Sequence, residues 1–103
     1  MPSYQYCKVA NHPELLLALE QQIISILRKY PGKRLTSSEI SGFIYQPDVI
    51  KALVRIIETS NPRWNIKSVI GAVAEEMSRQ GKIKKGSYRA DPITQVMEET
   101  WYI

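Results

Sequence analysis

The sequence is poor in the side chains that most enzymes and metal sites use. Among 103 residues it has a single cysteine, Cys7, and a single histidine, His12. These two side chains cannot supply the usual ligands of a zinc site or a complete catalytic triad. The adjacent glutamates at 75–76 and at 98–99 point in different directions on a helix or a strand, so neither pair forms an acid and a base. We therefore expect a protein that is not an enzyme, with no metal, no cofactor and no small-molecule substrate.

Long apolar runs are also missing, and no segment approaches the roughly 20 residues that span a bilayer. The first residues lack the basic start and the apolar middle of a signal peptide. One cysteine cannot form an internal disulfide, which suits a reducing compartment. These absences predict a cytoplasmic protein with no membrane partner. The length predicts one domain, and we expect an arm or short strand over residues 1–12 and a domain over residues 13–103.

The positive charge is unevenly distributed along the chain, although the net charge is only +4. Residues 61–90 contain seven Lys/Arg against two Asp/Glu, a net of +5. The last thirteen residues contain three Asp/Glu and no base, a net of −3. The segment 61–90 is therefore the place where the sequence predicts contact with a polyanion.

Helical periodicity and capping residues predict four helices. Pro13 and the Pro31-Gly32 pair limit the first helix. Thr36, followed three residues later by Glu39, is a capping box that predicts a short second helix. Further helices are predicted over 47–59, after Pro47, and over 65–80, where apolar residues recur at helical spacing up to Gly81.

Two apolar residues of the first helix, Leu17 and Ile24, lie away from its apolar stripe. They must therefore meet the N-terminal arm, the C-terminal tail or another subunit. The last alternative predicts a homodimer through Leu17 and Ile24.

The order of these elements resembles a winged helix-turn-helix domain. The resemblance rests on "RLTSSEISGFI" as a strand and second helix, on "NIKSVIGAVAEEMSRQG" as a recognition helix, and on "KIKKGSYR…TWYI" as a wing. It covers residues 13–103 and implies a mainly α, α+β fold with about four helices and a small antiparallel wing sheet. The recognition helix is expected at about 65–80 and the wing at about 82–103. The helix at 47–59 departs from the pattern: either it is an insertion, or it is itself the second helix.

The resemblance implies binding to double-stranded DNA, most simply by a small transcriptional regulator. The helix N-terminus favours a phosphate, the outer helix face would meet the major groove, and the wing would contact the backbone. A bare backbone at Gly71 would let the helix approach a groove, although this glycine could equally mark a close helix–helix crossing. The predicted DNA-binding residues are Arg63, Asn65, Lys67, Ser68, Gly71, Lys84, Lys85, Ser87, Tyr88 and Arg89.

The alternative hypothesis is a winged helix that serves as a protein–protein interaction module in a larger assembly. Glu75 on the expected reading face, the modest net charge, the apolar surplus on the first and third helices and the acidic tail support it. The two hypotheses make different predictions about the surface. An interaction module requires a conspicuous apolar patch, whereas DNA binding requires one continuous basic surface, formed here by Lys67, Lys84, Lys85 and Arg89.

Overall fold

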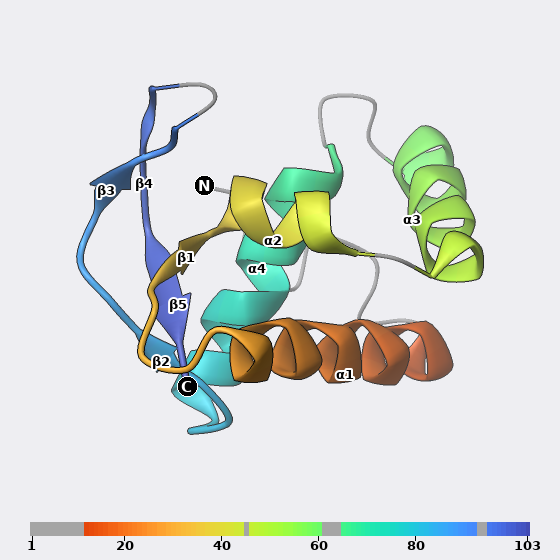
Figure 1. Cartoon of the computed structure of the whole chain (residues 1–103). Coiled ribbons are helices and arrows are strands. Elements are labelled where there is room, and N and C mark those ends of the chain that lie inside the picture. The colour runs from red at the N-terminus through yellow and green to blue at the C-terminus, as the bar shows by residue number, and fades with distance from the viewer. Residues whose placement is uncertain (1–11, 45, 61–64, 93–94) are drawn as a thin grey trace.

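A computed structural model describes residues 12–44, 46–60, 65–92 and 95–103 (Figure 1). The described part contains four helices and five short strands, so the expected α+β, mainly α, fold class is confirmed. In chain order the elements are α1 (Pro13–Lys29), β1 (Leu35–Thr36), α2 (Ser37–Phe43), α3 (Pro47–Ser60), α4 (Ile66–Arg79), β2 (Lys84–Lys85), β3 (Arg89–Ala90), β4 (Met97–Glu98) and β5 (Thr100–Tyr102).

The helices begin and end where local signals in the sequence predict. The Thr36 side chain accepts a hydrogen bond from the Glu39 amide, and the Glu39 carboxylate accepts one from the Thr36 amide, so the capping box at α2 is complete. At the other end of the helical region, α4 is followed by Gly81 at φ 80°, a conformation that favours glycine. These boundaries are set by neighbouring residues, which is why the sequence predicts them well.

Two small antiparallel sheets follow from the strand pairing. The first has the order β1-β5-β2, with Trp101 of β5 opposite both Leu35 and Lys85. The second is a ribbon formed by β3 and β4 alone, in which Arg89 lies opposite Glu98. Figure 1 shows this ribbon extending beyond the three-stranded sheet. The wing segment 82–103 therefore supplies two strands, β2 and β5, to a sheet that joins the core, and it forms a ribbon that extends past this sheet.

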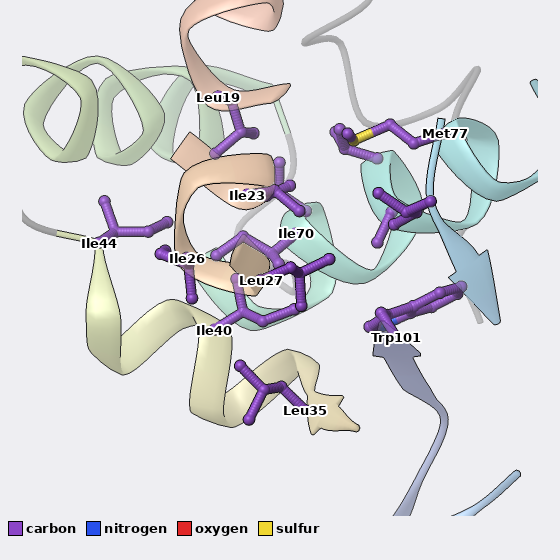
Figure 2. Close-up of a cluster of buried hydrophobic side chains, with 14 of the residues drawn as sticks. Leu19, Ile23, Ile26, Leu27, Leu35, Ile40, Ile44, Ile70, Met77 and Trp101 are labelled. Carbon is purple, nitrogen blue, oxygen red and sulfur yellow. The ribbon is translucent and has the colours of Figure 1, made fainter. Parts of the chain in front are cut away.

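Helix α4 is the centre of the hydrophobic core. Residues 69–74 of α4 are all buried, so the middle of this helix is covered on every side. Apolar side chains from α1, α2 and β5 pack around it (Figure 2). The fully buried large side chains include Leu19, Ile23, Ile26, Leu27, Leu35, Ile40, Leu53, Val69, Ile70, Met77 and Trp101. The outer face of this helix, which was expected to meet a DNA groove, is therefore closed in the middle of α4, at Gly71.

Helix α2, and not α3, is the main partner of α4. Helix α2 makes the most extensive contact with α4, whereas α3 packs against α1 and α4 from one side of the molecule (Figure 1). In the sequence, the segment 47–59 therefore lies between two helices that pack directly on each other in the structure.

Some predictions concern residues that the structure does not describe, and others remain untested. The arm at residues 1–12 lies, apart from His12, outside the described residues. Leu17 on α1 is 56% exposed, and Ile24 is partly buried against the core. In the described ranges, every helix is too short or too polar to cross a membrane.

Candidate functional site: a groove between α4 and the wing ribbon

A groove of about 340 Å³ opens where the β3–β4 ribbon stands beside the N-terminal half of α4. It draws its side chains from three parts of the chain, namely the start of α2, α4 and the wing. Its lining residues are Ser37, Lys67, Ser68, Gly71, Tyr88, Val96, Met97, Glu98 and Glu99. Four of these, Lys67, Ser68, Gly71 and Tyr88, belong to the predicted DNA-binding set.

The wing side of the groove carries three large apolar side chains that are open to solvent. Tyr88 is 61% exposed, Val96 55% and Met97 59%. Two backbone hydrogen bonds, Asp91 N to Val96 O at 3.0 Å and Gln95 N to Asp91 O at 2.8 Å, hold the end of the ribbon that carries Val96 and Met97. Neighbouring exposed apolar side chains of this kind are typical of surfaces that bind another molecule.

The floor of the groove is the crossing of α2 and α4. Gly71 is buried, and a Cβ atom at this position would lie 3.1 Å from the Ser37 Oγ. Ser37 Oγ in turn accepts a hydrogen bond from the Trp101 indole N–H at 3.3 Å. The prediction that Gly71 offers an open backbone to a DNA groove is therefore wrong, because α2 covers it; the alternative of a helix–helix crossing is confirmed.

Lys67 is paired within the chain. Its ammonium lies 3.3 Å from the Glu98 carboxylate, which is contributed by the ribbon. Glu98 also accepts hydrogen bonds from the Ser38 hydroxyl at 2.8 Å and from the Ser38 backbone N–H at 3.3 Å. The Glu98 carboxylate is buried. Its contacts join the ribbon to α2 and neutralise the charge of Lys67.

Lys85 is held between two carboxylates, Glu75 at 2.9 Å and Glu99 at 3.2 Å. The hydrogen bond with Glu75, and then that with Glu99, raises the pKa of Lys85. The Tyr88 hydroxyl donates to Glu99 at 3.0 Å, and this hydrogen bond is the main cause of the raised pKa of Tyr88. Glu99 therefore accepts from an ammonium group and a phenol at the edge of the groove.

Arg89 points back toward α2. Its guanidinium forms an ion pair with Glu39 and donates a hydrogen bond to the Arg34 carbonyl at 3.0 Å. Arg89, Lys67 and Lys85 are thus three predicted DNA-binding residues that already have a carboxylate partner. The positive charge of segment 61–90 is therefore largely balanced by acids from α2, from α4 and from the C-terminal strands.

The residues at the start of α4 bond to each other. The Asn65 side chain accepts from the Ser68 backbone N–H at 2.8 Å and from the Ser68 hydroxyl at 3.0 Å. Asn65 is thus the N-cap of α4. Arg63, the other residue predicted near this end, lies outside the described residues.

Lys84 differs from the other predicted bases, because it is exposed and has no ion pair within the described residues. Its ammonium lies 5.8 Å from the centre of the Tyr102 ring, and the Arg34 guanidinium lies 5.1 Å from the same ring. Arg34 also donates to the Ser87 hydroxyl at 3.4 Å. Arg34 was missed by the sequence analysis because strand pairing of β1 with β5 brings it here.

The groove residues Ser37, Val96, Met97, Glu98 and Glu99 were likewise missed. The only local signal was two apolar residues, Val96 and Met97, directly before two glutamates and the predicted terminal strand. In the described part of the chain, no three His, Cys, Asp or Glu residues gather in a way that could hold a metal.

Comparisons with protein-family models, with curated proteins and with solved structures find no match for this chain.

Proposed function

We propose that this chain is a protein-interaction module that binds its partner in the groove between α4 and the wing ribbon. The observation that carries the proposal is the apolar wall formed by Tyr88, Val96 and Met97. This wall stands where the sequence predicted a basic, DNA-reading surface. It provides the apolar patch that distinguishes the interaction hypothesis from the DNA hypothesis.

The charges of the groove also favour a protein partner. Lys67, Lys85 and Arg89 each have a carboxylate partner, so a DNA phosphate would compete with an ion pair for each of them. Binding to DNA depends on bases that are free to replace the counterions of the phosphates. Glu99 in the groove lining shares Lys85 with Glu75, so the excess negative charge there would repel a phosphate backbone.

The dimensions of the groove suit a side chain of a partner. Its volume of about 340 Å³ lies at the lower end of the range of pockets that hold small ligands or anchoring side chains. Protein interfaces commonly obtain much of their binding energy from one or two apolar anchors in such pockets. Binding would bury the exposed apolar surface of Met97 and Val96. Each Å² of apolar surface removed from water stabilises a complex by about 25 cal/mol.

The proposal is tested with a displayed library of random 12-residue peptides selected on the wild-type protein. Selected peptides are synthesised, and their affinities are measured for the wild type, for Met97→Lys and for Val54→Lys. Val54 is a matched control, because it is an exposed apolar residue on α3. We expect Met97→Lys to weaken binding at least about tenfold, as loss of an anchor does, and Val54→Lys to have no effect. Peptides that bind all three proteins equally would refute the groove as the binding site.

Double-stranded DNA binding, as by a small transcriptional regulator, is a second candidate function, supported by a different observation. Lys33, Arg34 and Lys84 are exposed and have no ion pair within the described residues. A labelled random-sequence duplex, followed by fluorescence anisotropy at several salt concentrations, tests it. Three phosphate contacts predict a slope of log K on log salt of about −3. Lys84→Glu should then reduce affinity more than Lys51→Glu, which makes the same charge change on α3; equal effects would reject this surface.

A homodimer through Leu17 and Ile24 is a further possibility that the packing leaves open. A depression of about 490 Å³ along α1 is lined by Ile24 together with polar residues, and Leu17 is exposed on the same helix. Light scattering of the wild type and of Leu17→Lys tests it, and a wild-type monomer at high concentration would exclude it. A cytoplasmic location likewise remains a proposal, based on the single cysteine.

A further inference from the structure

The charged side chains around the groove leave one negative charge in excess. Lys67 pairs with Glu98, and Lys85 pairs with both Glu75 and Glu99. This group therefore contains three carboxylates and two ammonium groups. Arg79 adds little to the balance, because its closer partner is Glu76, at 3.0 Å.

Glu75 and Glu99 share the charge of Lys85, and of these two glutamates it is Glu99 that lines the groove. Its Oε1 atom accepts from Tyr88 at 3.0 Å and lies 3.2 Å from Lys85. Its Oε2 atom is buried and has no hydrogen-bond partner in the described part of the chain. A carboxylate oxygen without a donor is unfavourable when it is removed from water. Because Oε2 is closed to solvent, a cationic group in the groove would stabilise Glu99 through its charge and not as a donor to this atom.

Tyr88 adds a second feature that suits a cation. Its ring is exposed at the groove, and its hydroxyl is bonded to Glu99. An ammonium or guanidinium group interacts favourably with an aromatic face as well as with a carboxylate. The combination of Glu99 with the Tyr88 ring therefore favours Lys or Arg over a neutral or acidic side chain.

From these contacts we infer that the groove selects a segment of a partner protein in which a bulky apolar side chain stands next to a lysine or arginine. The apolar side chain packs against Val96 and Met97, and the cation lies between the Glu99 carboxylate and the Tyr88 ring. This inference rests on the proposed function and adds the chemistry of the partner. The negative excess disfavours a nucleic acid in the same groove.

The inference is tested with an array of synthetic nonapeptides of otherwise varied sequence. Each peptide has Leu at position 5 and either Lys, Gln or Glu at position 6, and a parallel set has Ser-Lys at these positions. The array is probed with the labelled wild-type protein, Met97→Lys, Glu99→Gln and Tyr88→Leu. Tyr88→Leu preserves an apolar wall but removes the ring and its hydroxyl, so it serves as the second variant if Glu99→Gln disturbs the wing.

We expect the wild type to bind Leu-Lys peptides about fivefold more tightly than Leu-Gln peptides, because one partly exposed charge contact contributes an effect of about this size. We expect it to bind Leu-Glu and Ser-Lys peptides weakly. Glu99→Gln and Tyr88→Leu should each reduce the preference for Lys while Leu-Gln binding is retained. Met97→Lys should abolish binding to all peptides that contain Leu at position 5.

Other outcomes separate the two proposals. Equal binding of Leu-Lys and Leu-Gln peptides by the wild type would overturn the cation preference but leave the groove as a protein-binding site. Binding that does not depend on Met97 would overturn both. Self-association that is abolished by Met97→Lys, without peptide binding, would identify a second copy as the occupant and would also overturn the inference.

Discussion

The helical core and the junction between α2 and the wing are stabilised by different kinds of interaction. Between α1, α2 and α4 the buried side chains are almost all aliphatic, as Figure 2 shows for Ile23, Ile40 and Ile70. The junction is polar. There the Thr36 hydroxyl donates to Asp91 at 2.9 Å, Ser38 bonds to Glu98, and Arg89 pairs with Glu39.

This difference explains why the sequence did not indicate which of its basic residues would be paired. Apolar contacts are non-directional, so the core depends mainly on volume and burial. Polar contacts need a particular partner in a particular position, and a buried polar group without its partner is costly. In this protein much of the basic charge near the wing is paired with such partners, and the most exposed side chains of the groove are Tyr88, Val96 and Met97.

The largest expected effect comes from the core. Ile70→Ala removes a fully buried side chain from the centre of α4 and should lower the free energy of unfolding by about 3–4 kcal/mol. Urea denaturation followed by circular dichroism measures this change. Val54→Ala on the exposed side of α3 should change it by less than about 0.5 kcal/mol. A small effect of Ile70→Ala would mean that α4 is not the centre of the core.

The junction should respond to loss of a single hydroxyl. Thr36→Val preserves the side-chain shape but removes both the cap of α2 and the bond to Asp91, which should cost about 2 kcal/mol. Asn65→Ala removes the exposed cap of α4 and should cost about 1 kcal/mol. Urea denaturation measures the loss of unfolding free energy in each variant. Equal losses for Thr36→Val and Asn65→Ala would contradict a larger contribution from the buried junction.

One polar residue breaks the apolar character of the core. Gln22 on α1 is 2% exposed, and neither atom of its amide has a hydrogen-bond partner in the described part of the chain. Gln22→Met should therefore stabilise the protein by about 1–2 kcal/mol. Thermal unfolding of this variant is compared with Gln21→Met, whose exposed position predicts almost no change. Loss of stability in Gln22→Met would show that the amide is needed where it lies.

The smallest expected effect is a pH dependence at the wing. The pKa values of Lys85 and Tyr88 are both raised, so their contribution to stability is present at neutral pH and is lost as pH rises above about 10. Glu99→Gln removes the main cause of the shift at Tyr88 and one of the causes at Lys85. Thermal melts from pH 7.5 to 11 should therefore show the Tm of the wild type falling more steeply than that of Glu99→Gln. Parallel curves would contradict the contacts at Glu99.

The helices could be predicted from the sequence, whereas the candidate site could be predicted only in part. The capping box of α2 and the glycine that follows α4 act over three or four residues, so their effect is visible in the sequence. The periodicity of α4 indicated which face is apolar. It did not indicate that α2 would cover Gly71 on the opposite face.

The sequence by itself determined the four helices, the mainly α composition and the presence of a charged wing, because these depend on local propensity and on the order of residues. Only the tertiary structure decided which charges remain free. The partners of Lys67 and Arg89 lie 31 and 50 residues away along the chain. Such pairs form only when packing of the core brings the wing against α2 and α4. The same packing leaves Tyr88, Val96 and Met97 exposed at a groove, because no other described element covers the ribbon there.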